Sequence, residues 1–254
     1  GSPRKTAWLK TFLDEVEQEV PLTGRSLLDV GCGEGLLLDA GRERGANVKG
    51  IEPEAAVVAE LNARGLAGFA GLLEDYTPEP GESWDVITMF LVIDAMIDPV
   101  GALKKLRGMV SDDGVLAILT GSRYKTPFFT KPAFGYGGVV PRIVRDPLVK
   151  FRPEADWADY HPYFFTRKTL LAMLKVAGFE TVYCTSEQIG GTRLVARPTE
   201  PVPLAQVETE DPRELAKDFE NWHRFDRTVR PVYKTLVEKP VMLAARAVGR
   251  GGNR

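Results

Sequence analysis

Three glycines at alternate positions, Gly31, Gly33 and Gly35, stand in the stretch LLDVGCGEGLLLDAG, between a short apolar run and a leucine-rich segment. Glycine tolerates positive φ and lets a ligand approach the backbone without meeting a Cβ. A helix that begins after such a turn adds its positive end and free N–H groups. These residue types favour a ligand held by backbone at the end of a strand, although a tight turn without a ligand would use the same glycines.

Glu52 follows this glycine loop at a distance of roughly twenty residues, where a strand of an α/β sheet would end beside the ligand crevice. It directly precedes Pro53, which stops the second apolar segment. One carboxylate at that place can accept hydrogen bonds from both hydroxyls of a ribose. The spacing G-x-G-x-G differs from that of dinucleotide-binding folds and of P-loops, which argues against a pyrophosphate or triphosphate ligand.

The elements that must position these residues alternate along the chain. Strands are predicted at 26–30, 47–53, 67–76 (with a turn), 83–93 and 112–121 (opening with a turn), and an antiparallel hairpin at 180–185 and 192–198. Helical periods are predicted at 6–20, 33–45, 54–65, 99–110 and 166–179. Such alternation requires a mostly parallel sheet with helices on both faces, which binds ligands beyond the carboxyl ends of its strands.

The 254 residues are enough for one large α/β domain with appendages. We expect a lead-in helix in 1–24, the main domain in 25–198 and a helical C-terminal extension in 199–254. Residues 121–162 carry prolines, aromatics and glycines without a clear period. Because an irregular segment of that length inside a compact domain is usually functional, we interpret it as an inserted lid over a binding pocket.

The composition excludes several classes of protein. The 33 basic and 35 acidic residues are spread along the chain, unlike the basic footprint of a nucleic-acid binder. No apolar run approaches the length of about 20 residues that a transmembrane helix needs. The two cysteines and two histidines lie far apart in the sequence and match no metal-binding spacing. We therefore expect a cytoplasmic protein without a metal, a nucleic-acid partner or a transmembrane segment.

The segments LLDVGCGEG, VKGIEP, FAGLLEDY, WDVITMFLVIDAMIDPVGALKKLRGMVSDDGVLAI and HPYFFTRKTLLAMLKVAGF resemble the class I S-adenosylmethionine-dependent methyltransferases. The likeness covers residues 25–198 and is strongest to the branch that holds ubiquinone-type O-methyltransferases and sugar or natural-product tailoring enzymes. It implies a doubly wound, Rossmann-like sheet of seven strands and a small-molecule acceptor. S-adenosylmethionine would be the methyl donor and S-adenosylhomocysteine the product.

The resemblance also implies a cofactor site. Its residues would be Asp29, Gly31, Gly33, Gly35, Glu52, Pro53, Leu72, Leu73, Phe90 and Leu91. The first four would surround the methionine moiety, and Glu52 would hold the ribose hydroxyls. Leu72 and Leu73 would meet the adenine through apolar contact and a backbone N–H. Phe90 and Leu91 would flank the sulfonium.

The chain departs from the ubiquinone-type enzymes in the element after the predicted fourth strand, where those enzymes carry an HxxEH-like motif. Here the sequence is FLVIDAMIDP, in which only Asp94 keeps an acid and Ala95 replaces a histidine. A general base would then come from elsewhere, and histidine has the pKa suited to that task. His161, in DYHPYFFT, is the candidate together with Asp94, and the alternative for His161 is a capping or packing role.

These observations predict methylation of a small molecule, with oxygen as the preferred acceptor atom and a sugar or secondary metabolite ahead of a quinone. C-methylation of a nucleotide-linked sugar and a non-catalytic module that binds a partner protein both stay open. The basic residues of 121–160 would suit an anionic acceptor, and equally a solvated loop. An apolar stripe at helical spacing after residue 214 is typical of core or of a homodimer contact.

Overall fold

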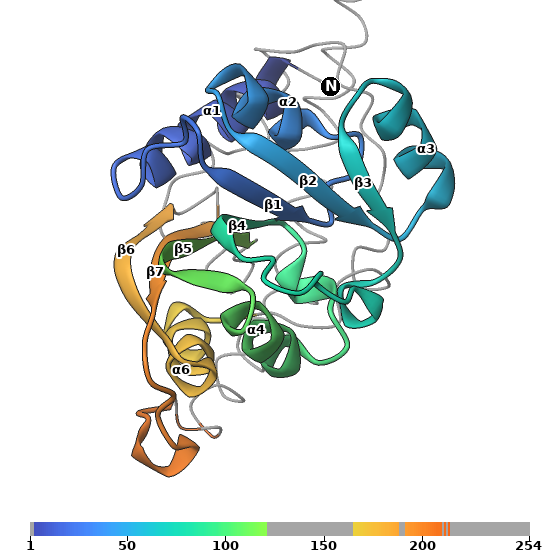
Figure 1. The fold of residues 1–254 in the computed structure, drawn as a ribbon. Helices are drawn as coiled ribbons and strands as arrows, with labels where there is room; N and C mark the ends of the chain where they lie inside the picture. The colour runs from blue at the N-terminus through green and yellow to red at the C-terminus, as the bar shows by residue number, and fades with distance from the viewer. Residues whose placement is uncertain (1–2, 121–164, 188–190, 210, 212, 214–254) are drawn as a thin grey trace, which may run out of the picture. The chain divides into compact units, whose positions relative to one another are not determined.

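A computed structural model of the chain describes residues 3–120, 165–187, 191–209, 211 and 213 (Figure 1). Apart from the last residues, the described part belongs to one compact unit, Gly1–Tyr124 with Ala158–Glu208. The lid predicted at 121–162 and most of the predicted C-terminal extension lie outside the described residues. The fold that follows is therefore that of the first unit alone.

Seven strands form one sheet in the order β3-β2-β1-β4-β5-β7-β6. The strands are β1 (Ser26–Val30), β2 (Asn47–Glu52), β3 (Ala67–Ala70), β4 (Trp84–Phe90), β5 (Val110–Thr120), β6 (Phe179–Glu187) and β7 (Gly191–Pro198). β1 to β5 pair in parallel, and β7 runs antiparallel to both of its neighbours. This confirms the predicted doubly wound, mostly parallel sheet of class I methyltransferase type, including its terminal hairpin.

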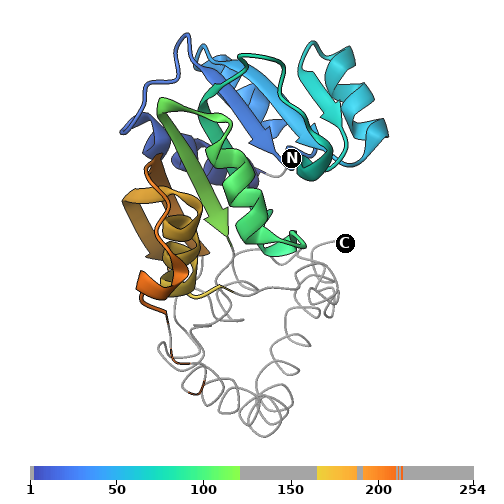
Figure 2. The ribbon, with the colours of Figure 1, turned by 60° about the horizontal axis from the view of Figure 1, so that its bottom comes forward.

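Five helices of the described residues cover the two faces of the sheet. They are α1 (Pro3–Glu17), α2 (Leu36–Glu43), α3 (Ala55–Ala63), α4 (Pro99–Arg107) and α6 (Arg167–Ala177). The first three lie on one face and α4 and α6 on the other (Figure 1). Figure 2 shows α4 and α6 side by side, and the two helices contact each other. The sheet is thus buried on both faces, as parallel sheets require.

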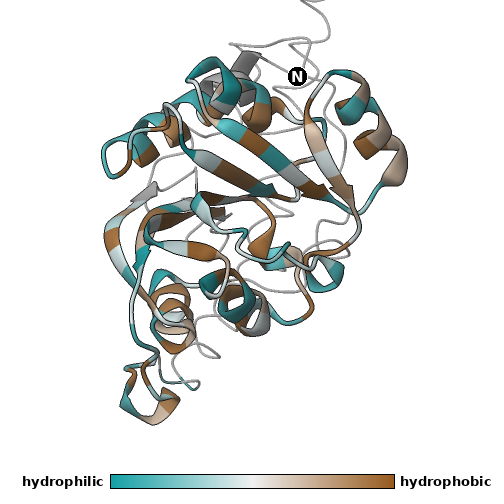
Figure 3. Cartoon of the chain, viewed as in Figure 1, coloured by the Kyte–Doolittle hydropathy of each residue, from teal (hydrophilic) through white to brown (hydrophobic). Residues whose placement is uncertain are grey.

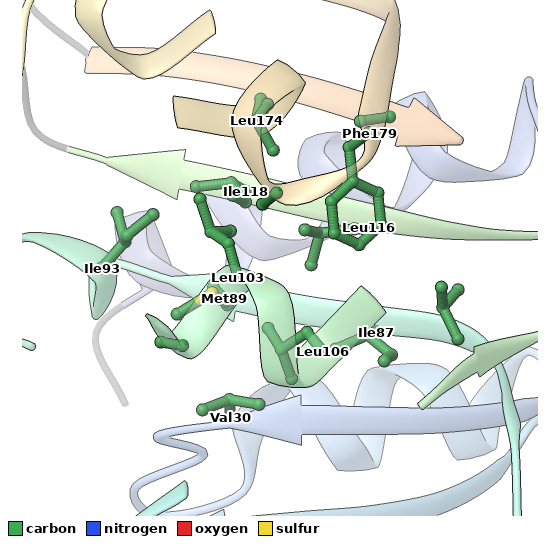
Figure 4. Packing of buried hydrophobic residues seen from close by; sticks show 14 of the residues in the cluster. Val30, Ile87, Met89, Ile93, Leu103, Leu106, Leu116, Ile118, Leu174 and Phe179 are labelled. Atoms are coloured by element: carbon green, nitrogen blue, oxygen red, sulfur yellow. The ribbon is translucent and has the colours of Figure 1, made fainter. Parts of the chain in front are cut away.

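The core consists of two apolar layers separated by the sheet. Because neighbouring strand residues point to opposite faces, Leu27 packs toward α1 and α2, whereas Leu28 packs toward α4 and α6. Figure 3 shows the resulting hydrophobic segments on the strands and on stripes of the helices. Figure 4 shows part of the layer between the sheet and helices α4 and α6, where Leu103 and Leu106 of α4 lie over the strands.

Local signals mark several helix ends. Pro99 opens α4 as predicted, and the Asp98 side chain caps that helix by accepting a hydrogen bond from Gly101 N at 2.8 Å. Gly178 closes α6 in the left-handed conformation, with φ 89°. No helix among the described residues has both the length and the apolar character needed to cross a membrane.

The turn predicted at the start of the fifth strand is wrong, because β5 already begins at Val110. β4 pairs Trp84 with Val110 and then Val86 with Val115, so the register shifts between these pairs. At this irregularity four residues of β5, 111–114, stand opposite the single β4 residue Asp85, and two of the four are exposed aspartates. Gly114 allows the close passage, since a Cβ there would lie 2.8 Å from the carbonyl oxygen of Asp85.

A buried ion pair attaches α1 to the terminal hairpin. Arg193 Nε of β7 lies 2.8 Å and 3.0 Å from the two carboxylate oxygens of Glu15. Tyr183 of β6 donates its hydroxyl to the same carboxylate at 3.0 Å. The side chains of Glu15 and Arg193 are 11% and 7% exposed, so the pair that joins α1 to β7 is shielded from water.

Candidate functional site

The carboxyl ends of four neighbouring parallel strands meet at one edge of the sheet. The loops that leave this edge are residues 31–35 after β1, 53–54 after β2, 71–72 after β3 and 91–92 after β4. The strand order reverses between β1 and β4, which is where sheets of this kind bind ligands. All of the cofactor residues predicted from the sequence lie on these loops, at the strand ends before them, or one residue beyond them.

The glycine loop has the predicted conformation: φ is 71° at Gly31, 51° at Gly33 and 75° at Gly35. The surroundings of the three glycines differ, however. A Cβ at Gly31 would lie 2.5 Å from Val92 Cγ2, and a Cβ at Gly35 would lie 2.4 Å from Leu61 Cδ2. No described atom lies within 4 Å of a Cβ built on Gly33. Gly31 and Gly35 therefore serve packing as well as backbone conformation, whereas Gly33 offers bare backbone for a ligand.

Glu52, the last residue of β2, is held against the glycine loop. Its Oε2 accepts a hydrogen bond from Gly33 N at 2.9 Å, and its Oε1 accepts one from Glu54 N at 3.2 Å. The residue is half-buried, and the adjacent Pro53 is exposed. Each carboxylate oxygen can accept more than one hydrogen bond, so the anchored group keeps capacity for a pair of hydroxyls.

Asp29 lies near the carboxyl end of β1 and is buried, with only 2% of its surface exposed. The register of β1 and β4 pairs it with Thr88, whose hydroxyl donates to Asp29 Oδ1 at 2.7 Å. Sequence reasoning identified Asp29 but missed Thr88. The only signal for Thr88 was a polar residue within the apolar run of a buried strand, and that signal does not reveal its partner.

Cys32 is the buried residue between the first two glycines of the loop. Its Sγ lies 2.4 Å from where a Cβ at Gly50 of β2 would stand, so residue 50 has no room for a side chain beside Cys32. Burial raises the pKa of the Cys32 thiol to about 12, and the nearby charges of Asp29 and Glu52 add to the effect. The thiol is therefore protonated at neutral pH and is a packing group, not a nucleophile.

The chain leaves β4 through a strained residue. The strand was predicted to continue to residue 93 but ends at Phe90, because Leu91 adopts a left-handed φ of 61°. Leu91 is the one non-glycine residue with positive φ in the described part of the chain, and this conformation costs about 1–2 kcal/mol. Leu91 N donates to Leu119 O at 2.7 Å, and the following Val92 packs against Gly31. The turn thus brings the segment after β4 onto the glycine loop.

Helix α1 reaches the same edge of the sheet. Phe90 makes edge-to-face ring contacts with Trp8 and Phe12, at centroid distances of 6.3 Å and 5.5 Å. The helical spacing of Trp8 and Phe12 predicted a helix, but no pattern in the sequence identified Phe90 as their partner. One side of the predicted sulfonium region is therefore backed by aromatic rings from α1.

The structure separates the two leucines predicted to meet the adenine. Leu72 is 47% exposed in the loop after β3, whereas Leu73 is 2% exposed and belongs to the core beneath the short 3₁₀ helix η1 (Leu73–Asp75). Because η1 turns the side chain of Leu73 inward, Leu72 is the better placed of the two for the predicted apolar contact. The adenine contacts of both residues stay a prediction.

The two candidate catalytic residues stand differently. Asp94 lies in the short 3₁₀ helix η2 (Ile93–Ala95) after β4 and is 6% exposed. His161 lies outside the described residues, so its catalytic role stays a prediction. Among the described residues, no group of three or more histidine, cysteine or acidic side chains is arranged to hold a metal ion.

Residues 4–183 match a family model described as a methyltransferase domain. Similar curated proteins include the ubiquinone biosynthesis O-methyltransferase of Marinobacter nauticus, which is 29% identical over 126 residues, covering 46% of this chain and 52% of the relative. The corresponding enzyme of Ralstonia nicotianae is 34% identical over 113 residues, covering 40% and 45%. The chain spans about half the length of the curated relatives it matches.

Solved structures share the fold at low sequence identity. An S-adenosylmethionine-dependent methyltransferase from Mesorhizobium loti is 17% identical, with a TM-score of 0.56 over 76% of this chain and 97% of that one. An amino pentose methyltransferase from Micromonospora echinaspora, solved with bound S-adenosylmethionine, is 21% identical, with a TM-score of 0.53 over 76% and 91%. Together with the family match and the strand order, these likenesses show that the chain belongs to the class I S-adenosylmethionine-dependent methyltransferases.

Proposed function

We propose that this protein transfers a methyl group from S-adenosylmethionine to an oxygen atom of a small molecule. The observation that carries the proposal is the arrangement of Glu52 and Gly33. The Glu52 carboxylate, at the end of β2, is held by a hydrogen bond from Gly33 N. No described atom lies within 4 Å of the position that a Cβ of Gly33 would take. A ribose with an adjoining methionyl group needs both features side by side.

The residues of this edge would divide the work of binding. Glu52 would accept hydrogen bonds from the ribose hydroxyls, the backbone at Gly33 would face the methionine moiety, and exposed Leu72 would contact the adenine. The bound cofactor supplies an electrophilic methyl group to an acceptor in line with the sulfonium. The protein's main contribution to such a transfer is alignment and exclusion of water, to which Phe90 and Leu91 would contribute.

A sugar or secondary metabolite is a better acceptor candidate than a quinone. The curated relatives act in ubiquinone biosynthesis, but their branch carries histidines after β4 where this chain has Ala95 and apolar residues. Asp94 is buried, which leaves His161 as our first candidate for a general base. A base of this kind adds about 10²–10⁴-fold to the rate when the acceptor is a hydroxyl.

Two alternatives belong to the same fold. C-methylation of a nucleotide-linked sugar would use the same cofactor edge and differs only in the acceptor. A non-catalytic module that binds a partner protein would explain the missing histidines. Such a module has no need of a ribose-binding acid, and the anchored Glu52 therefore argues against it.

Calorimetric titration of S-adenosylhomocysteine tests the cofactor site. We expect wild type to bind and Glu52→Ala to bind about ten- to a hundredfold more weakly, because a charge-assisted contact to two hydroxyls is lost. Glu54→Ala is the matched control, since its exposed side chain is adjacent and only its backbone N–H contacts Glu52. Equal affinities of wild type and Glu52→Ala would refute this site, and no binding by wild type would favour the partner-binding module.

A further inference from the structure

Arg64 reaches the glycine loop from the end of α3. It is the residue after the last turn of that helix, and Gly65, with φ 74°, follows it and ends the helix as predicted. Arg64 Nη1 donates to the carbonyl oxygen of Glu34 at 2.7 Å. Glu34 stands between Gly33 and Gly35, so this contact is made to the middle of the loop.

Resting on the function proposed above, we infer that Arg64 is a positioning residue that holds the glycine loop ready for the cofactor. Hydrogen bonds with two charged side chains flank the peptide bond between Gly33 and Glu34. The preceding N–H, of Gly33, is bound by the Glu52 carboxylate at 2.9 Å, and the following carbonyl, of Glu34, is bound by the Arg64 guanidinium at 2.7 Å. Both bonds are charge-assisted, which makes them stronger than neutral ones.

These two hydrogen bonds matter because a glycine backbone without them can adopt many conformations. A loop that must be ordered when its ligand arrives lowers the affinity, whereas a loop ordered in advance does not. The apolar side of the loop is supported from the same helix, since Leu61 fills the space beside Gly35. The end of α3 thus provides both an apolar support and a cationic anchor for the loop.

The guanidinium is itself oriented by α2. Arg64 Nη2 is paired with Asp39 Oδ2, and Asp39 Oδ1 accepts from Arg42 Nη2 at 2.9 Å. Arg42 also donates to the carbonyl oxygen of Arg64 at 3.4 Å but has no hydrogen bond to the loop in this network. The side chains of Arg64 and Asp39 are 42% and 29% exposed, and ion pairs of that exposure add little to global stability. Loss of Arg64 should therefore affect ligand affinity much more than folding.

The test compares Arg64→Gln with Arg42→Gln as a matched control, because both remove a guanidinium paired with Asp39 and only Arg64 contacts the loop. We expect Arg64→Gln to weaken S-adenosylhomocysteine binding about three- to tenfold in calorimetry, the loss that corresponds to one hydrogen bond of typical net strength, because Arg64 orders the loop and does not itself contact the ligand. Arg42→Gln should stay within about twofold of wild type, and both melting temperatures should fall only slightly.

Two further variants make the outcome decisive. Arg64→Lys keeps a charge but not the forked donors, and we expect it to recover part of the affinity. Asp39→Asn leaves Arg64 in place without its orienting carboxylate, and we expect an intermediate loss. Equal affinities of wild type and Arg64→Gln, or equal losses in Arg64→Gln and Arg42→Gln, would overturn the inference alone. No binding by wild type would instead overturn the proposed function, and the inference with it.

Discussion

At the scale of single residues, the three loop glycines have separable roles although they look alike in the sequence. All have positive φ, but Gly31 is in contact with Val92, Gly35 is in contact with Leu61, and Gly33 has no described neighbour at its Cβ position. Substitution by alanine should therefore mainly lower the stability of the protein at Gly31 and mainly weaken ligand binding at Gly33.

We expect Gly33→Ala to cost about 1 kcal/mol of stability through its positive φ. We also expect it to weaken S-adenosylhomocysteine binding about tenfold, because the methyl group would project toward the proposed ligand position. Gly31→Ala should destabilise the protein by a further 1–3 kcal/mol or so, because its methyl group would overlap Val92. Urea unfolding and calorimetry on both variants measure the two effects. A loss of affinity in Gly33→Ala no greater than in Gly31→Ala would contradict the assignment of Gly33 to ligand contact.

At the scale of elements, α1 is more than a lead-in to the domain. It contributes rings that contact Phe90 at the candidate site, and it is attached to β7 by the buried pair of Glu15 and Arg193. The sequence predicts a lead-in helix in 1–24 that is separate from the main domain in 25–198. In the structure α1 packs into one of the two apolar layers of that domain.

We expect Glu15→Gln to lower the free energy of unfolding by about 3 kcal/mol, because the buried guanidinium of Arg193 would lose its carboxylate. Glu17→Gln, two residues further along α1, is the control. Glu17 pairs with Arg44 at 3.0 Å but its side chain is 34% exposed, so we expect a loss of about 1 kcal/mol or less. Urea denaturation of both variants gives the comparison. Similar small losses in the two would show that burial of the Glu15 pair contributes little to holding α1.

At the scale of the whole molecule, we expect ligand binding at the proposed site to raise global stability, because loops after four strands form that site. A ligand that binds only the folded state stabilises it by about 2.7 kcal/mol at a hundred times its dissociation constant. For a domain of this size, that corresponds to a rise in melting temperature of roughly 5–10 °C.

We therefore expect S-adenosylhomocysteine to raise the melting temperature of wild type, and to raise that of Glu52→Ala much less at the same concentration. Differential scanning fluorimetry over a concentration series measures both shifts. Adenosine alone is a useful comparison, since it carries the ribose but not the methionine moiety. An identical rise in wild type and Glu52→Ala would show that the ligand stabilises the fold from another place.

Much of the fold followed from local rules. Strand and helix alternation predicted the parallel sheet, and Pro99, Gly65 and Gly178 marked helix ends that the structure confirms. The prediction of a turn before the fifth strand failed, because β5 already pairs with β4 at Val110 and the register shifts within the strand. Two aspartates followed by a glycine look the same in the sequence whether they form a turn or an irregular stretch of a strand.

The sequence by itself determined the positive φ of the loop glycines and the position of Glu52 at a strand end, because both depend on neighbours along the chain. Only the tertiary structure decided which glycine is open, which side of η1 Leu73 faces, and that Thr88 and Arg64 reach Asp29 and the Glu34 carbonyl. Those features depend on strand register and helix packing. Register and packing result from the simultaneous fit of residues far apart in sequence, which no local spacing encodes.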